Sequence, residues 1–329
     1  MSEEVMSWAL IVPYLAVGFL FLAKGADWLV DGGSSIARKA GISTLVVGLT
    51  VVAWGTSMPE VVVSTVAAWN GDTSISIGNV LGSNIANIGL VLGASALVLP
   101  RVMEQALRPR ELFWLFGSLG TLWWVCLDSA ITRSDALVLL GVFLAHNLHL
   151  WLSSRAAGFI TDDASPMEAV RYPGLKLVVG IAMISSGAYL VVEGAVAGAY
   201  RLGMNEMVVG LTVVAIGTSL PELAAGVGSA LKGESEISLG NVVGSNVFNL
   251  LAVLGIVGVI QPLIPTGEAN DPLAIGFGEA LAVDLPTVFG FSLAVAALPF
   301  LPGGGRLKGF LLLASFVIYT AVRVIQATS

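Results

Sequence analysis

The chain has 329 residues, of which 56% are hydrophobic and 11% charged, with a net charge of −7, and its mean hydropathy is +0.90. Soluble domains carry about 25% charged residues, so a chain this poor in charge cannot solvate its own surface, and lipid must be the solvent for much of it. The acidic balance argues against nucleic acid as a partner, and the single cysteine, Cys126, excludes an intrachain disulfide framework and a thiolate metal site.

Ten segments are apolar enough to cross a bilayer, which takes about 20 mostly apolar residues in a helix. In chain order they are 8–31, 42–68, 75–98, 112–128, 135–153, 174–199, 205–231, 237–261, 277–299 and 307–325. The first lacks a basic flank and a small-residue cleavage site, so we expect a retained helix rather than a signal peptide. The sequence therefore predicts an all-α integral membrane protein with ten transmembrane helices.

Lysine and arginine are distributed unequally between the two sides of this layout. One side, which includes the N-terminus, holds Arg133, Arg201 and Arg323. The other side holds eleven basic residues: Arg38, Lys39, Arg101, Arg108, Arg110, Arg155, Arg171, Lys176, Lys232, Arg306 and Lys308. Cytoplasmic loops are rich in Lys and Arg, so we expect both termini outside. Short loops without a large regulatory domain favour a prokaryotic plasma (inner) membrane.

The chain repeats itself at an offset of 162 residues. Residues 48–93 align with residues 210–255 without a gap, and 25 of the 46 pairs are identical. Each half contains five predicted spans, an odd number, so the second copy enters the membrane from the opposite face. We therefore expect two inverted five-helix repeats, residues 1–160 and 161–329. Inverted repeats build many secondary transporters, whose sites lie near the midplane on interrupted helices of both halves.

Two polar motifs interrupt matching spans of the two halves. GTSMPE at 55–60 returns as GTSLPE at 217–222, and GNVLGSNIAN at 78–87 returns as GNVVGSNVFN at 240–249. Proline and glycine free backbone carbonyls from the helical ladder, and in lipid those groups need a partner such as a bound cation. We expect spans two, three, seven and eight to be broken at Gly55, Pro59, Gly78, Gly82, Gly217, Pro221, Gly240 and Gly244.

Each motif places oxygen-bearing side chains three or four residues apart, on one helix face. The set comprises Thr56, Ser57, Glu60, Ser83 and Asn87 with their counterparts Thr218, Ser219, Glu222, Ser245 and Asn249. Oxygen ligands without histidine or thiol are what hard cations, Ca²⁺ in particular, prefer. For Thr56 or Ser83 alone, close helix packing is an equally good explanation. Two carboxylates are different, because each costs roughly 3 kcal/mol at the bilayer centre.

These motifs resemble the alpha repeats of the calcium/cation antiporter superfamily, most closely its sodium/calcium exchanger branch. The resemblance covers residues 42–98 and 204–260, and the ten-span layout extends it to nearly the whole chain. It implies antiport of Na⁺ and Ca²⁺ by alternating access, with both ions as substrates and no resident cofactor. The ligands implied are Glu60 and Glu222 for both ions, Thr56 and Thr218 for Ca²⁺, Ser57, Ser83, Ser219 and Ser245 for Na⁺, the carbonyls of Ala53 and Ala215, Asn87, and Asn249 where some members have Asp.

The coupling ion is the less determined part of this interpretation. Proton-coupled calcium exchangers of the same superfamily typically carry a glutamate after the G-N pair, where this chain has Gly82 and Gly244. This difference favours Na⁺, and the neutral Asn249 argues against K⁺ co-transport. A proton-coupled calcium exchanger is the alternative, and a passive channel is a further one. An intramembrane enzyme is remote, because the polar spans contain no nucleophile–histidine arrangement. We expect a monomer in the lipid bilayer, without an obligate protein partner.

Other polar residues are expected to have structural roles. Asp31 and Glu193, repeat mates near the ends of spans one and six, should lie at the membrane interface or pair with Lys24. Asp284, at the start of span nine, is expected to belong to an acidic outward loop.

Two histidines and three tryptophans also need an interpretation. His146 and His149 could bind a metal, but no third ligand is near them in the sequence, so helix packing is the better explanation. Trp114, Trp123 and Trp124 are typical of membrane-interface anchors.

Overall fold

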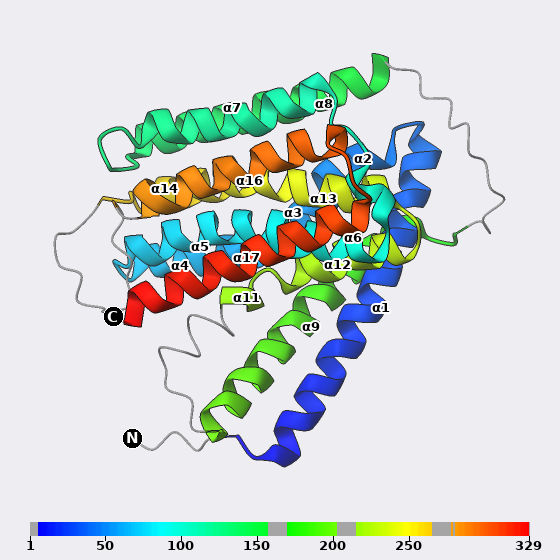
Figure 1. Ribbon diagram of the computed structural model, residues 1–329, viewed down its shortest axis with the longest axis horizontal. Helices are drawn as coiled ribbons and strands as arrows, with labels where there is room; N and C mark the ends of the chain where they lie inside the picture. The colour runs from blue at the N-terminus through cyan, green and yellow to red at the C-terminus, as the bar shows by residue number, and fades with distance from the viewer. Residues whose placement is uncertain (1–5, 157–169, 203–214, 265–277, 279, 329) are drawn as a thin grey trace.

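The computed structural model describes residues 6–156, 170–202, 215–264, 278 and 280–328. Regular secondary structure in this part is helical, and a single bridge pairs Ile131 with Leu263. The α-helices are α1 (Trp8–Ala40), α2 (Thr44–Val47), α3 (Ala53–Thr56), α4 (Met58–Trp69), α5 (Thr73–Ala86), α6 (Gly93–Val98), α7 (Pro109–Val125), α8 (Arg133–Ala156), α9 (Pro173–Arg201), α11 (Ala215–Gly217), α12 (Leu220–Leu231), α13 (Ser235–Phe248), α14 (Leu254–Ile260), α16 (Leu285–Ala297) and α17 (Gly305–Thr328) (Figure 1).

Wider and tighter helical turns connect some of these elements. The π-helical turns are η1 (Gly48–Val52), η2 (Asn87–Leu92), η5 (Asn249–Val253) and η6 (Ala280–Asp284), and the 3₁₀ turns are η3 (Pro100–Met103) and η7 (Leu298–Phe300). Single π turns inside α-helices occur often at functional sites.

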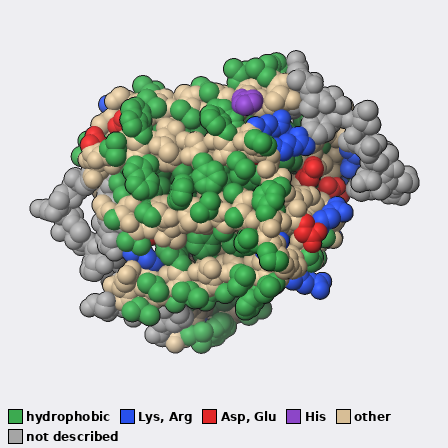
Figure 2. All heavy atoms as spheres, turned by 45° about the horizontal axis from the view of Figure 1, so that its top comes forward, with side chains coloured by type: hydrophobic (Ala, Val, Ile, Leu, Met, Phe, Trp, Pro, Cys, Tyr) green, Lys and Arg blue, Asp and Glu red, His purple; other side chains and the backbone are tan. Residues whose placement is uncertain are grey.

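Several helices are suited to a membrane. Within the described residues, seven are long and apolar enough to cross one, and the bent pair Thr44–Thr56 and Met58–Trp69 would make an eighth. Figure 2 shows hydrophobic side chains spread across the middle of the visible face, with charged side chains gathered toward its edges. The predicted all-α membrane protein is confirmed. The count of ten spans stays a prediction, because the span at 205–231 lies partly outside the described residues and α7 has only 17 residues.

Helix α1 is longer than the sequence predicts. It continues past residue 31 to Ala40 and ends at Gly41, whose φ of 65° is in the left-handed region. Glycine adopts that conformation readily, and Arg38 and Lys39 in the last turn complement the negative end of the helix dipole.

Helices α1 and α9 form an antiparallel pair, one end of which extends beyond the other helices, while α1 also packs against α12 and α2 (Figure 1). Glycines let the two backbones approach closely. A Cβ on Gly25 would lie 2.8 Å from the carbonyl oxygen of Gly180, and a Cβ on Gly180 would lie 2.6 Å from the nitrogen of Leu29. Small residues at helix contacts are the usual means of tight packing in membranes. We call this pair the α1–α9 arm.

Helix α13 lies at the centre of the remaining bundle. The apolar helix from Ser235 to Ile260 is the most buried of the candidate spans. α13 packs against α2, η1 and α3, which belong to the other half of the chain. A Cβ on Gly240 would lie 2.7 Å from the carbonyl oxygen of Leu45 and 3.1 Å from the Cα of Gly48. The two sequence repeats are therefore interlocked rather than side by side.

The interruptions lie partly where the sequence predicts them. α3 and α4 meet at Ser57 with a bend of 43°, and α11 and α12 are separated by Thr218 and Ser219. The predicted breaks at Gly78, Gly82, Gly240 and Gly244 are wrong: α5 and α13 run through these glycines, and helical geometry changes only at Asn87 and Asn249. Glycine keeps its backbone N–H and costs a helix about 1 kcal/mol, whereas proline removes the donor and costs about 3 kcal/mol.

The expectation for Asp284 is also wrong. This side chain is 3% exposed, at the end of η6, instead of lying in a solvated loop. Arg323 of α17 approaches it with Nε 3.3 Å from Oδ1, and the Tyr319 hydroxyl donates to the same oxygen at 2.7 Å. Burial of a carboxylate requires such partners. They lie more than 30 residues away in the chain, beyond the reach of local sequence reasoning.

Candidate cation site

The two helix breaks bring Glu60 and Glu222 into the protein interior. Each glutamate is the third residue of a new helix, α4 or α12, after a serine at the break and a proline in the first turn. Both side chains are 0% exposed. The proline sets a helical φ without wasting a backbone donor, since the first-turn N–H groups have no intrahelical acceptor. The repeated G-T-S-x-P-E string therefore builds the same local geometry twice.

The broken helices also provide partial charges at the site. The N-termini of α4 and α12 are positive helix ends, which favour the ionised carboxylates in their first turns. The C-terminal end of α3 offers carbonyl oxygens, which favour a cation. Anionic side chains and carbonyl dipoles thus lie beside the same bends.

A hydrogen bond between the two halves joins the motifs. Ser57 donates its hydroxyl to Glu222 Oε1 at 2.7 Å. The reverse bond is not made: the hydroxyl of Ser219 and both carboxylate oxygens of Glu60 have no hydrogen-bond partner among the described residues. Glu222 Oε2 likewise has none. The site is symmetric in sequence and asymmetric in its hydrogen bonds.

Hydroxyls crowd the carbonyl end of α3. Thr56 Oγ1 lies 3.1 Å from the Val52 oxygen, 3.2 Å from the Ala53 oxygen and 3.2 Å from Asn241 Oδ1. Ser245 Oγ of α13 lies 3.5 Å from the same Ala53 oxygen. A hydroxyl has a single proton, so Thr56 chooses among three acceptors, and the choice decides which oxygens remain available to a ligand.

Amide side chains form the next part of the site, where η2 and η5 begin. Asn249 donates to Ser83 Oγ at 3.2 Å, and Asn87 donates to Asn246 Oδ1 at 3.1 Å. The amide oxygens of Asn87 and Asn249 have no partner among the described residues, although both side chains are 0% exposed. These oxygens are therefore free to accept from, or coordinate, a further group.

Most of the predicted residues are brought together by the structure. Bonds or shared partners connect Ala53, Thr56, Ser57, Ser245 and Glu222, while Asn249 bonds to Ser83 and Asn87 bonds to Asn246. Among the described residues, no hydrogen bond joins the side chains of Glu60 and Ser219 to these sets. Two predicted residues are less well described. Thr218 lies half-buried at the break, and Ala215 begins α11 directly after residues outside the described part.

Sequence reasoning missed Asn241 and Asn246. Both are buried, and each contacts a predicted site residue. Their positions in the repeated G-N-x-x-G-S-N string were a signal, because Asn79 and Asn84 occupy the matching places in the first half. Of the asparagines in this motif, the sequence predicts as ligands only the last of each copy, Asn87 and Asn249.

The arrangement suits a hard cation. A buried carboxylate without a partner is strongly unfavourable, so Glu60 requires either a proton or a cation beside it. The unpartnered oxygens of the predicted residues belong to carboxylate, hydroxyl and amide groups, which is the ligand chemistry of Ca²⁺ and other hard cations. Within the described residues, no group of three or more His, Cys, Asp or Glu side chains could hold a metal. Any cation here must draw on the neutral oxygens.

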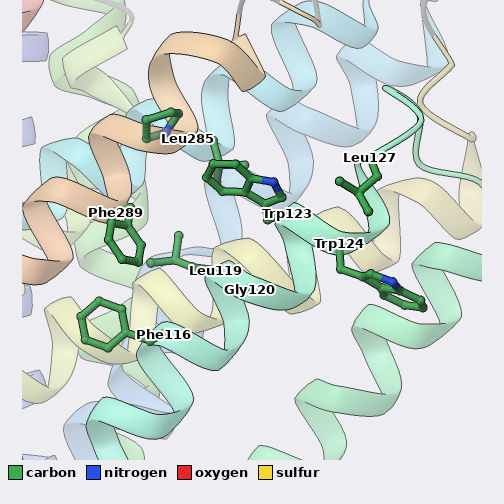
Figure 3. Close-up of a pocket in the computed structure, with 9 residues that line it drawn as sticks. Phe116, Leu119, Gly120, Trp123, Trp124, Leu127, Leu285 and Phe289 are labelled. Carbon is green, nitrogen blue, oxygen red and sulfur yellow. The ribbon is translucent and has the colours of Figure 1, made fainter.

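An apolar groove between α7 and α16 is a separate feature. It encloses ≈ 570 Å³ and is lined by Phe116, Leu119, Gly120, Trp123, Trp124, Leu127, Leu285, Pro286 and Phe289 (Figure 3). These walls have no charged group and cannot coordinate an ion. Trp123 and Trp124 are 52% and 61% exposed, and their place at the membrane interface stays a prediction.

The two histidines pack beside a tryptophan between α7 and α8. The Trp114 indole donates to His149 Nδ1 at 3.0 Å, and its ring lies 5.1 Å from that of His146. These contacts support a helix-packing role for the two histidines. Trp114 takes part in the same packing, which its expected role as a membrane-interface anchor does not explain.

Comparison with known proteins gives a consistent result. The family described as sodium/calcium exchanger protein matches residues 10–152 and 174–325. CaxA of Alkalimonas amylolytica is 38% identical over 93% of this chain and 96% of its own length. The inner membrane protein YrbG of Escherichia coli is 35% identical over 95% and 96%, and the sodium/calcium exchanger MaX1 of Methanosarcina acetivorans is 33% identical over 76% and 83%.

Solved structures of the sodium-calcium exchanger NCX_Mj share the fold. One of them, soaked with Na⁺ and Sr²⁺, superimposes with a TM-score of 0.78 at 30% identity, over 96% of this chain and 99% of the other. A second, soaked without Na⁺ and Ca²⁺, gives 0.77 over the same shares. The chain belongs to the sodium/calcium exchanger protein family, whose members are membrane transporters and not enzymes.

Proposed function

We propose that this protein exchanges Na⁺ for Ca²⁺ across a membrane, by alternating access at a shared site built from Glu60 and Glu222. One observation carries the proposal: two fully buried carboxylates stand at matching positions of the two halves, and three of their four oxygens have no partner among the described residues. Such groups are rare inside membranes and usually mark ion pathways.

The ligand roles follow the two motifs. Glu60 and Glu222 bind both ions, and Thr56 and Thr218 add oxygens for Ca²⁺. The four serines Ser57, Ser83, Ser219 and Ser245 line flanking Na⁺ sites together with the carbonyls of Ala53 and Ala215, and Asn87 and Asn249 complete the set between them. The unpartnered oxygens of Glu60, Ser219, Asn87 and Asn249 support these roles.

The transport cycle follows from charge balance. Two ionised glutamates balance one Ca²⁺, or they are shared among several Na⁺. Because both ions use the same oxygens, occupancy is mutually exclusive, which antiport requires. The empty, doubly charged site is the costly state to carry through apolar surroundings, so uncoupled return is suppressed. Movement of the α1–α9 arm against the remaining helices opens the site to one side at a time.

The membrane arrangement completes the proposal. Ten transmembrane helices form two inverted repeats, residues 1–160 and 161–329, with both termini outside and the protein acting as a monomer in a prokaryotic inner membrane. The distribution of Lys and Arg supports this orientation, and YrbG, an inner membrane protein by its name, is a relative over nearly the whole chain.

Sodium is favoured over protons as the coupling ion. Gly82 and Gly244 stand where proton-coupled relatives of the superfamily have glutamate, and the neutral Asn249 adds no group that can take up a proton. MaX1, named a sodium/calcium exchanger, supports the same choice. A proton-coupled calcium exchanger is the second candidate, because the two buried glutamates could also bind protons.

Vesicles test the coupling ion directly. Purified protein is reconstituted, and ⁴⁵Ca²⁺ uptake is measured with an outward Na⁺, K⁺ or proton gradient imposed one at a time. We expect uptake with the Na⁺ gradient alone, and none in Glu60→Gln vesicles. Uptake that follows the pH gradient and ignores Na⁺ would overturn the sodium assignment. Flux without any counter-ion would indicate a channel.

A further inference from the structure

Asn241 touches both halves of the proposed site. It lies in α13, is 0% exposed, and its Oδ1 is 3.2 Å from Thr56 Oγ1 at the end of α3. Its Nδ2 donates to the backbone oxygen of Glu222 at 3.3 Å. One amide thus bridges the two broken helices that supply Thr56 and Glu222.

The hydrogen bonds fix which way the amide faces. The Glu222 backbone oxygen can only accept, so the NH₂ end of Asn241 must point toward it. The oxygen end therefore faces Thr56, where it can only accept. The hydroxyl of Thr56 is left as the donor of that contact.

This geometry bears on what Thr56 can offer a cation. A hydroxyl that coordinates a cation must direct its proton away from it, because the proton carries partial positive charge. Thr56 has three acceptors within reach: Val52 O, Ala53 O and Asn241 Oδ1. The Ala53 oxygen already accepts from the Ser57 N–H at 3.1 Å and lies 3.5 Å from Ser245 Oγ. Proton donation to Asn241 leaves the Ala53 carbonyl less crowded and turns a lone pair of Thr56 toward the site.

The backbone holds Asn241 at this distance. Its neighbour Gly240 packs directly on the carbonyl of Leu45 and the Cα of Gly48, in the segment that leads to α3. The close approach of α13 to this segment fixes the amide opposite Thr56. Movement of Asn241 would require separation of the two helices.

The repeat mate of Asn241 has a different partner. Asn79 donates to Ser64 Oγ at 3.0 Å, and Ser64 in turn lies 3.4 Å from the carbonyl of Ser76. Gly226 replaces Ser64 in the second half, and the amide of Asn241 bonds to the Glu222 backbone instead. Asn79 is therefore a matched control for the loss of a motif asparagine.

We propose that Asn241 is a positioning residue for the cation site: it accepts the Thr56 proton, orients the Thr56 oxygen toward Ca²⁺, and ties the Glu222 backbone to the same point. This inference rests on the proposed function for the roles of Thr56 and Glu222. It predicts that Asn241 acts on Ca²⁺ affinity through Thr56, rather than through general stability.

The test is a double-mutant cycle read by equilibrium ⁴⁵Ca²⁺ binding to the purified, full-length protein. Asn241→Leu, which keeps the size and removes the acceptor, should raise the half-saturating Ca²⁺ concentration about tenfold, the effect of one hydrogen bond. Asn241→Asp, which keeps an oxygen facing Thr56, should recover part of the loss. In a Thr56→Val background, which itself weakens binding, Asn241→Leu should add a clearly smaller change than it does in wild type, because only the bond to the Glu222 backbone remains to be lost.

Controls separate the possible failures. Asn79→Leu should leave Ca²⁺ binding within about twofold of wild type. The positioning role would be overturned if the Asn241→Leu variant kept wild-type Ca²⁺ affinity. It would also be overturned if Asn241→Leu lowered Ca²⁺ affinity by the same factor with and without Thr56→Val. Either result would leave the proposed function intact. Wild-type protein that binds no Ca²⁺, or Glu60→Gln protein that binds it normally, would overturn the proposed site and the inference with it.

Discussion

Lys232 connects the turn between α12 and α13 to the α1–α9 arm. Its Nζ lies 2.7 Å from Asp31 Oδ1 and 3.5 Å from Asp27 Oδ1, and it donates to the Asp27 carbonyl at 2.7 Å. Lys176, at the start of α9, approaches the other Asp31 oxygen at 3.1 Å. If the arm moves during transport, the contacts of Lys232 must break in one of the two states.

The size of this contribution can be worked out from exposure. The Lys232 side chain is 28% exposed, and those of Asp31 and Asp27 are 26% and 50% exposed. Partly exposed ion pairs contribute roughly 0.2–1 kcal/mol each. Together with the bond to the Asp27 carbonyl, we expect the Lys232 contacts to stabilise the arrangement in this structure, with α1 held against the α12–α13 turn, by about 1–2 kcal/mol. That is a factor of about 5–30 in a conformational equilibrium.

Lys232→Gln should therefore favour the state in which α1 is separated from this turn. The α12–α13 turn is predicted to lie on the cytoplasmic face of the membrane. Apparent Ca²⁺ affinity should rise on that face and fall on the other, in each case by up to the factor of about 5–30. The assay is the half-saturating Ca²⁺ concentration for Na⁺-driven exchange, measured in inside-out and right-side-out vesicles.

Lys24→Gln is the matched control. Lys24 Nζ lies 3.9 Å from Asp27 Oδ2 within α1 itself, so its loss removes a charge beside the same carboxylate without touching the α12–α13 turn. The Lys24→Gln variant should keep the wild-type Ca²⁺ affinity on both faces of the membrane. Equal changes on both faces in Lys232→Gln, or the same sidedness in both variants, would refute the reasoning.

Three further changes test the site and the packing. Glu60→Gln and Glu222→Gln should each abolish Na⁺-driven ⁴⁵Ca²⁺ uptake while the protein still reaches the membrane, and near-normal flux in either would contradict the site. Gly240→Ala places a Cβ 2.7 Å from the Leu45 carbonyl oxygen, so it should cost about 1–3 kcal/mol of stability and lower the melting temperature in detergent. Gly117→Ala is the control, because nothing described lies within 4 Å of the added Cβ, and it should leave the melting temperature unchanged. Equal melting temperatures for the two variants would contradict the interlocked packing. Asn249→Asp adds a third carboxylate that can bind a proton. As the pH is lowered, Ca²⁺ uptake by this variant should therefore begin to decline at a higher pH than uptake by the wild type, and an unchanged pH profile would be the opposing result.

The positions of the helices and of the two glutamates could be predicted from sequence. Long apolar runs identify most of the helices, because lipid demands them. The repeated motif pairs Glu60 with Glu222, and both are buried. α1 is the exception in length: Gly32, Gly33 and Ser34 have the composition of a loop, yet α9 packs so closely on Gly32 that a Cβ there would lie 2.6 Å from the Leu177 nitrogen. Contact between helices, not local preference, extends α1.

The asymmetry of the site could not be predicted. Ser57 and Ser219 stand in nearly identical strings, yet only Ser57 is bonded to the glutamate of the other half. Local sequence cannot distinguish them, because the difference lies in packing between distant segments. The same holds for Asn79 and Asn241, whose partners depend on whether Ser64 or Gly226 occupies the facing helix.

The central claim is that Na⁺ and Ca²⁺ compete for one site containing Glu60 and Glu222. The most direct measurement is equilibrium ⁴⁵Ca²⁺ binding to purified protein as Na⁺ is raised at constant ionic strength. The account predicts that Na⁺ displaces Ca²⁺ completely and that excess Ca²⁺ reverses the displacement. Ca²⁺ that stays bound at saturating Na⁺, with Na⁺ bound to the same molecules, would contradict it.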